Sequence, residues 1–344
     1  MDKKRDFRID LLKTLAIFGV IVIHVCSYAQ PVASTPWVSA VFWGSLTRAS
    51  VPIFLMCSGA LLLSPEKPLQ LRRLFSHNIL RILIALLVWA MFYKIYRLNA
   101  VQNLSPETIL QAFGEVLQGD QEFHFYYLHL ILLMYLFLPV TRVLVRYANR
   151  QTLLYGLALW FLLGILYPTL QPFAVCRLFL QPISRWAISM PYASIGYSVL
   201  GYYLQRYAKG KPWMYLVLFA AGFAGTFGGT YGLSVQADAL SDEFLEGMSV
   251  GVACMAVGIF GFVMQFCQKH PIRHASGLVF LSKASFCIYL VHLYFLYKFY
   301  HWELTIDFAP YLISIPLLAL LAFLFSCLVY CFLRAVPSLR KWII

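Results

Sequence analysis

Apolar residues along this chain fall into long runs that are separated by short polar or charged stretches. A helix that crosses a lipid bilayer needs about 20 mostly apolar residues. Each run of that length predicts a membrane-spanning helix, with an uncertainty of about two to four residues at its ends. Ten runs qualify, at approximately 9–29, 38–63, 79–96, 123–140, 152–170, 186–207, 212–233, 244–266, 277–300 and 310–333.

The polar stretches between these runs predict the connections. Ser105-Pro106-Glu107 is typical of a helix start, with an N-cap residue followed by proline at the first helical position. The residues that follow, up to Gln118, predict a short amphipathic helix on the outer surface. Prolines prevent a continuous helix in a second outer loop, 171–184. Without a repeat or a long polar insertion, residues 1–344 are expected to form one all-α membrane domain with no soluble appendage.

The positive charges test this count, because Lys and Arg accumulate in the loops that stay in the cytoplasm. With the N-terminus inside, 21 of the 27 lysines and arginines fall on the inner side, five fall outside, and Arg48 lies within a span. Omitting one span would invert every later loop and destroy this asymmetry. The sequence therefore predicts a bundle of about ten helices with both termini in the cytoplasm.

Composition then excludes several classes of protein. The chain is 61% hydrophobic and 12% charged, whereas a soluble domain is about half apolar and a quarter charged. A soluble enzyme, a nucleic-acid-binding protein and a disordered chain are thereby excluded, and the net charge of +13 is explained by topology. The eight cysteines form no CxxC pair, so neither disulfides nor a structural metal is expected.

Ionisable residues within the spans are few, and such residues usually mark a substrate path or a catalytic site. Lys13 and His24 are eleven residues apart, so they lie on one stripe of one helix, separated by roughly 16 Å along its axis. Such a pair could bind two parts of one long molecule. The alternatives are that Lys13 extends to the cytoplasmic edge and that His24 is a hydrogen-bonded core residue.

Depth along the helices suggests that other polar residues join His24. His24, Arg48 and His292 each lie 15 residues from the inner end of their predicted helix, roughly 22 Å from the cytoplasmic boundary, and His129 lies roughly 17 Å from it. We therefore expect one polar layer in the outer half of the bundle that contains these four residues.

Four motifs in chain order resemble those of the acyltransferase family 3 membrane proteins. Lys13 and His24 are similar to the family's basic-x10-His signature, and residues 48–54 (RASVPIF) with Ser58-Gly59 resemble its second-helix motif. Residues 124–128 (HFYYL) resemble its fourth-helix motif, and residues 285–292 (SFCIYLVH) its late Tyr-Leu-x-His motif. Within the family, the bacterial surface-polysaccharide O-acetyltransferases of the enterobacterial common antigen type are most similar.

The chain also departs from the family pattern. The signature basic residue, often arginine, is Lys13, which keeps the charge but loses bidentate phosphate recognition. Tyr126 stands where tryptophan is usual. The family's cytoplasmic Arg-x-x-Arg has no clean copy, and Arg73, His77 and Arg81 are the nearest candidates. No part of residues 1–344 resembles the extracytoplasmic esterase-like domain of some members, so no acyl relay through such a domain is expected.

The resemblance implies transfer of an acyl group, acetyl by expectation, from cytoplasmic acetyl-CoA to a hydroxyl of a cell-envelope glycan or lipid-linked sugar. It also implies a bacterial cytoplasmic (inner) membrane as the location, with acyl-CoA as co-substrate rather than a bound cofactor. A neutral histidine can remove a hydroxyl proton, and His24 is the expected general base. Arg48 would stabilise the developing oxyanion, or hold His24 or the acceptor in place.

The remaining candidate residues fall into two groups, according to the substrate that each is expected to bind. The residues expected to bind acyl-CoA are Lys13, Arg72, Arg73 and Arg81, although loop arginines also serve topology and lipid headgroups. Those expected to bind the acceptor are His124, Tyr127, His129, Tyr289 and His292. Ser58 as an acyl carrier is disfavoured, because serine before glycine usually marks close helix packing. His270 and His274 lack a third metal ligand.

A different class of function also fits these features. Ten helices with a polar cluster at the midplane suit a transporter of an amino acid or other polar solute, or a flippase for a lipid-linked sugar. No inverted repeat is visible, and ten of the 14 acidic residues lie in predicted outer loops, an unusual setting for an anion carrier. The sequence leaves the oligomeric state open, a homo-oligomer included.

Overall fold

The long apolar runs form helices. The computed structural model describes residues 5–29, 34–66, 68–171, 173, 176, 185–272 and 275–344, and all regular structure in these residues is helical. Within them, nine helical stretches are long and apolar enough to cross a membrane. Each coincides with one of the predicted runs. Most of the predicted outer loop 171–184 lies outside the described residues.

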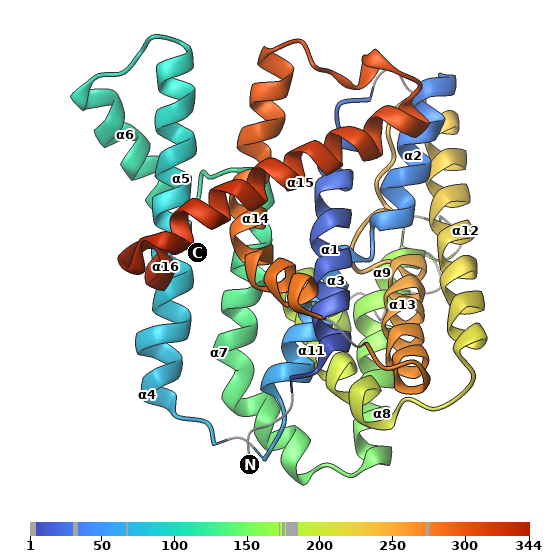
Figure 1. The fold of residues 1–344 in the computed structure, drawn as a ribbon. Helices are drawn as coiled ribbons and strands as arrows, with labels where there is room; N and C mark the ends of the chain where they lie inside the picture. The colour runs from blue at the N-terminus through green and yellow to red at the C-terminus, as the bar shows by residue number, and fades with distance from the viewer. Residues whose placement is uncertain are drawn as a thin grey trace.

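The helices follow one another in the order shown in Figure 1. The bounds of the α-helices are α1 Phe7–Cys26, α2 Thr35–Thr47, α3 Ser50–Leu62, α4 Leu71–Arg73, α5 Leu80–Ala100, α6 Pro106–Leu117, α7 Tyr126–Tyr147, α8 Arg150–Phe161, α9 Tyr167–Leu170, α11 Met190–Tyr207, α12 Pro212–Ala237, α13 Val250–Lys269, α14 Ser276–His301, α15 Tyr311–Ala335 and α16 Pro337–Trp342. The π-helical segments are Leu74–Ile79 and Leu162–Leu166, and the 3₁₀ turns are Phe123–Phe125 and Ile306–Phe308.

The remaining predicted run, 186–207, forms α11, which is rich in tyrosine, serine and glycine and is less apolar than the other long helices. The position of α11 inside the bundle explains this composition, because α11 packs against α3, α7, α8 and α13. A helix that is surrounded by protein has little surface to offer to lipid.

Close packing of α3 and α11 depends on two glycines, one on each helix. Each glycine faces the main chain of the other helix. A Cβ at Gly59 would overlap the main chain of Ser198, and a Cβ at Gly201 would overlap the main chain of Met56. Two helices can approach this closely only where small residues form the contact. The packing interpretation of the Ser58-Gly59 pair is therefore confirmed for Gly59.

The predicted helix after residue 105 is also confirmed, as α6. The Ser105 side chain accepts a hydrogen bond from the backbone N–H of Thr108 at 3.3 Å, and the Thr108 hydroxyl accepts one from the Ser105 N–H at 2.9 Å. This reciprocal cap satisfies amide groups that the first helical turn leaves free. On the neighbouring helix, Lys94 holds Glu115 and Asp120, each at 2.7 Å.

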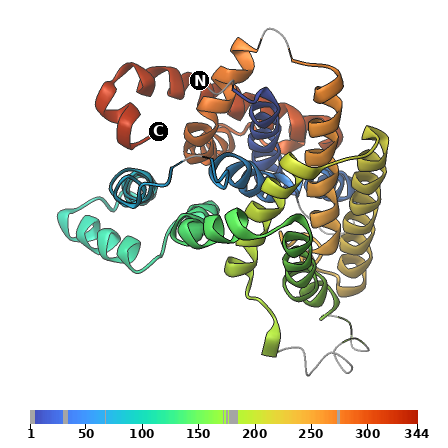
Figure 2. The ribbon, with the colours of Figure 1, turned by 90° about the horizontal axis from the view of Figure 1, so that it is seen from below.

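Helix α1 occupies the centre of the bundle and packs against α2, α3, α13, α14 and α15. Helices α5 and α6 stand on one side of the molecule and α12 on the opposite side, as Figure 2 also shows. Helix α15 runs obliquely across α14 and α1, and α16 therefore lies against α5 (Figure 1). This arrangement brings α1, α3, α5, α7, α14 and α16 around one internal space.

Candidate active site

Three histidines from three helices meet inside the bundle. His24 lies on α1, His124 on the 3₁₀ turn before α7, and His292 on α14. Their ring centroids are 5.1 Å apart for His24 and His292, 5.4 Å for His124 and His292, and 6.2 Å for His24 and His124. We call these residues the histidine cluster. His24 is partly exposed, whereas His124 and His292 are buried.

The hydrogen bonds of His292 fix which of its ring nitrogens can accept a proton. Its Nδ1 lies 2.7 Å from the carbonyl oxygen of Tyr289 and 3.2 Å from that of Ile288. A carbonyl only accepts hydrogen bonds, so Nδ1 carries the proton and Nε2 of the neutral ring has the lone pair. This Nε2 and both ring nitrogens of His124 are buried without a partner among the described residues. Unpaired buried polar atoms are costly and typical of functional sites.

Tyr289 connects the histidine cluster to a cavity. Its hydroxyl donates to the carbonyl oxygen of His124, and its ring centroid lies 5.5 Å from that of His124 and 6.1 Å from that of His292. The ring of Tyr127 lies 5.3 Å from that of Tyr289, and both tyrosines line the cavity. One side chain therefore belongs to both the cluster and the cavity.

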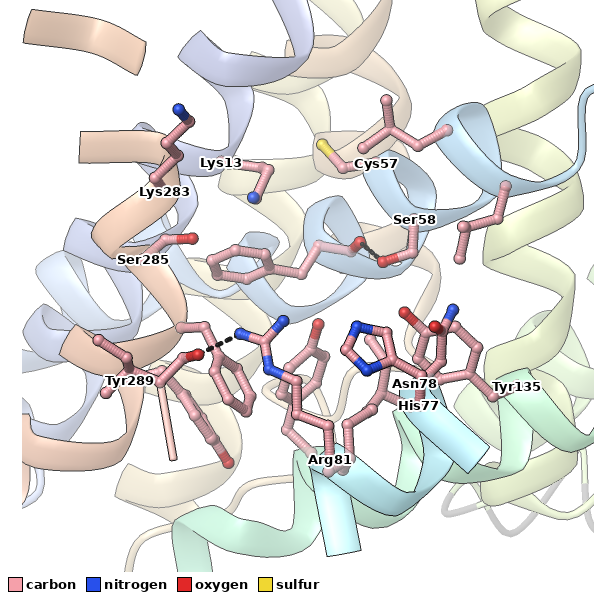
Figure 3. Close-up of a pocket in the computed structure, with 18 of the residues that line it drawn as sticks. Lys13, Cys57, Ser58, His77, Asn78, Arg81, Tyr135, Lys283, Ser285 and Tyr289 are labelled. Atoms are coloured by element: carbon pink, nitrogen blue, oxygen red, sulfur yellow. Dashed lines mark hydrogen bonds between the residues drawn. The ribbon is translucent and has the colours of Figure 1, made fainter. Parts of the chain in front are cut away.

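The cavity has a volume of about 540 Å³ and is bounded by α1, α3, the π-helical segment Leu74–Ile79, α5, α7, α14, α15 and α16. Its charged lining is entirely basic over the described residues, with Lys13, Arg81, Lys283 and Arg340 and no aspartate or glutamate. Figure 3 shows the Lys13 amino group and the Arg81 guanidinium directed into the space from opposite sides, with His77 beside Arg81. Such a lining is suited to a polyanion.

Lys13 presents its charge to the cavity without a carboxylate partner in the described part of the chain. Its amino group donates to the carbonyl oxygen of Ser282 at 3.0 Å. Asp10, almost one turn earlier on the same helix, instead accepts hydrogen bonds from Nε and one Nη of Arg5, at 2.6 and 2.7 Å. An anion in the cavity would therefore meet a lysine whose charge is not already neutralised.

Arg81 is held in place by contacts at the edge of the cavity. One Nη donates to the carbonyl oxygen of Ile344, and the guanidinium lies 5.5 Å from the ring centroid of Phe286. Its Nε is buried and has no partner among the described residues. Arg72 and Arg73, in contrast, are exposed and do not line the cavity. Of the four residues expected to bind acyl-CoA, the structure brings only Lys13 and Arg81 together.

Arg48 occupies a break in the second predicted span, between the end of α2 and the start of α3. Its Nε donates to the carbonyl oxygen of Leu245, in the loop before α13. The positive charge of Arg48 interacts electrostatically with His24. The carboxylates of Asp242 and Glu246 interact with the same Arg48 charge. Burial raises the pKa of Glu246, and the Arg48 charge opposes that rise. These contacts favour a positioning role for Arg48.

Four of the five residues expected to bind the acceptor come together, namely His124, Tyr127, Tyr289 and His292. The prediction that His129 shares a polar layer with His24 is wrong. His129 is exposed, and its Nδ1 faces the carbonyl oxygen of Phe125 on its own helix at 3.1 Å. Five residues separate it from His124, which corresponds to about 140° around a helix, so only one of the two can face the cluster.

A comparison with protein families gives a match over nearly the whole chain. The family model for an acyltransferase domain, that of acyltransferase family 3, matches residues 6–331. The chain belongs to acyltransferase family 3. No curated protein and no solved structure matches it.

This acyltransferase is thus an acyl-transfer enzyme with a membrane-embedded helical domain. Its histidine cluster holds nitrogen bases and its cavity holds cations, and Tyr289 lies between the two. In the described part of the chain, no three His, Cys, Asp or Glu side chains are placed to hold a metal ion. His274 lies outside the described residues, and His270 is exposed.

Sequence reasoning missed several residues that line the cavity or lie beside the histidine cluster. Lys283 and Arg340 were counted only as topological charges, yet both line the cavity. Tyr93 is fully buried, donates to the carbonyl oxygen of Leu290 at 3.0 Å, and places its ring 5.6 Å from that of His124. A tyrosine within an apolar run was the available signal for Tyr93, and a lysine within the predicted run 277–300 was the signal for Lys283. Nothing local distinguishes Arg340 from other loop charges.

Ser58 also lines the cavity of the acyltransferase. Its hydroxyl donates to the Phe54 carbonyl oxygen of its own helix at 2.9 Å (Figure 3). This back-bonding is the ordinary behaviour of serine within a helix, and it places no base beside the hydroxyl.

Proposed function

We propose that this enzyme transfers an acyl group, acetyl in the simplest case, from acyl-CoA to a hydroxyl of a cell-envelope glycan or lipid-linked sugar, with His24 as general base. The observation that carries the proposal is the shared position of Tyr289. A cavity suited to an anionic donor and a cluster suited to proton transfer meet at this one side chain. The donor and acceptor are therefore assigned to opposite sides of Tyr289.

The donor assignment is supported by charge and size. CoA carries several phosphate groups, and Lys13, Arg81, Lys283 and Arg340 supply four cations with no acidic residue in the described lining. A volume of about 540 Å³ lies within the usual range of about 300–1,000 Å³ for ligand pockets. Anchoring the phosphates near Lys13 would direct the thioester along α1 towards His24, because the two residues lie on one stripe of that helix.

The chemical step follows from the histidine cluster. The sugar hydroxyl oxygen attacks the thioester carbonyl carbon while a ring nitrogen of His24 accepts the hydroxyl proton. The carbon–sulfur bond then breaks, and the imidazolium returns the proton to the departing CoA thiolate. The products are an O-acyl ester and CoA, and His24 is again neutral. His24 is assigned this role because it is the partly exposed member of the cluster.

The other members of the site would bind and orient the acceptor. His292 exposes an Nε2 lone pair that can accept a hydrogen bond from a sugar hydroxyl. His124 lies beside His292 in the cluster, and Tyr127 and Tyr289 provide aromatic walls. Arg48 would hold the loop before α13 against this end of the site through Leu245.

The proposal is tested with purified protein in lipid nanodiscs, ¹⁴C-acetyl-CoA and a panel of cell-envelope glycans and lipid-linked sugars. We expect saturable CoA binding, and release of free CoA together with labelled glycan when a suitable acceptor is present. A matched His129→Ala protein should behave like the wild type, whereas His24→Ala should bind CoA without transferring acetyl. Protein that binds no CoA, but moves a labelled amino acid or sugar lipid across proteoliposomes, would support a transporter instead.

A further inference from the structure

Residues 337–344, which we call the α16 segment, fold back onto α5 beside the cavity. The indole nitrogen of Trp89 donates to the carbonyl oxygen of Ile343 at 3.2 Å, and Arg81 donates to that of Ile344. The rings of His77 and Trp342 lie 6.2 Å apart. Figures 1 and 2 show this segment against α5, where the oblique course of α15 brings it.

The α16 segment also forms part of the cavity itself. Arg340 and Ile344 are lining residues, and Ile344 is only 5% exposed. Docking of the segment therefore adds Arg340 to a space that already holds the charges of Lys13, Arg81 and Lys283. Like charges repel one another, and an anion in the cavity would relieve the repulsion that Arg340 adds.

Arg81 links the α16 segment to that anion. A guanidinium has five N–H donors and accepts no hydrogen bonds. The main-chain oxygen of Ile344 uses one of them. The Nε donor is buried without a partner among the described residues. The segment thus orients Arg81 while leaving its Nε donor for a ligand.

We propose that the α16 segment is a closing element of the donor site, in which Arg340 and Arg81 bind the phosphates of the donor together and so hold residues 337–344 against α5. This inference rests on the proposed use of acyl-CoA. Because binding free energies are reciprocal, a donor that stabilises the docked segment must itself bind more tightly when the segment is docked.

The experiment compares Arg340→Ala with Lys341→Ala. Each variant removes one cation from the same short helix, but Arg340 lines the cavity and Lys341 does not. Two probes are used in nanodiscs, CoA and pantetheine, which lacks the phosphates. We expect Arg340→Ala to raise the dissociation constant of CoA by about tenfold, as for loss of one charge-assisted contact. The affinity of Arg340→Ala for pantetheine should change less than about twofold. The affinities of Lys341→Ala for CoA and for pantetheine should also change less than about twofold.

Hydrogen–deuterium exchange gives a second readout that does not depend on affinity. Saturating CoA should slow amide exchange in residues 337–344 of the wild type and of Lys341→Ala, and should have a smaller effect in Arg340→Ala. Equal CoA affinities for the two variants, or exchange in the segment that CoA leaves unchanged, would overturn the closing role alone. Wild-type protein that binds no CoA would overturn the donor assignment as well.

Discussion

The imidazole rings of His24 and His292 lie 5.1 Å apart at centroid distance, although the residues come from opposite ends of the chain. Helices α1 and α14 pack directly against each other, and this contact brings the two rings together. The first and last of the four motifs in the sequence thus each contribute one histidine to the cluster.

Replacement of His24 by alanine should remove catalysis and leave donor binding intact. Loss of a general base typically costs about 10²- to 10⁴-fold in rate, whereas the cations that line the cavity are unaffected. Steady-state acetyl transfer and equilibrium CoA binding measure the two effects separately. His129→Ala is the matched control, since His129 is exposed on the other side of α7. Full activity of His24→Ala would refute the base assignment.

Tyr289→Phe should weaken acyl transfer by about tenfold without altering CoA affinity. The substitution keeps the aromatic wall of the cavity but removes the hydroxyl that holds the carbonyl of His124. Loss of a buried hydrogen bond costs about 1 kcal/mol, so the 3₁₀ turn that carries His124 should shift. Tyr126→Phe serves as control because Tyr126 is exposed. Identical kcat values for the two variants would show that the hydroxyl has no part in positioning His124.

Lys13→Ala and Arg81→Ala should each weaken CoA binding by about tenfold, the effect expected for one lost charge-assisted contact. Added salt should reduce the difference from wild type, because screening weakens the same attraction. Arg73→Ala is the control, since Arg73 is exposed and lies outside the cavity. Isothermal titration with CoA at two salt concentrations provides the measurement. An Arg73 effect as large as that of Arg81 would argue for general surface attraction instead.

Gly201→Ala should destabilise the fold by about 1–3 kcal/mol, the usual cost of overpacking a tight interior. The new methyl group would overlap the main chain of Met56, and backbone cannot move aside as a flexible side chain can. Gly225→Ala offers the matched change, because nothing lies within 4 Å of a Cβ at that position. Thermal unfolding in detergent should give a lower midpoint for Gly201→Ala only. Equal midpoints would mean that α3 and α11 separate at little cost.

Sequence alone predicted the helical membrane domain, the family and the cap of α6, and the structure and the family match confirm them. The reason is that these features are local. An apolar run must satisfy its backbone hydrogen bonds internally in lipid, so it becomes a helix whatever its neighbours are. The alignment of Lys13 with His24 is likewise a property of one helix, whereas the catalytic role of His24 stays a prediction.

Only the tertiary structure decided which polar residues share a site. A 3₁₀ turn before α7 directs His124 into the cluster and leaves His129 outside. The oblique course of α15 carries Arg340 to the cavity, where a count of charges along the chain could not place it. Hydrophobicity determines that a segment is a helix and roughly where it begins and ends. The face that it turns inward depends on packing against segments distant in sequence, which no local pattern records.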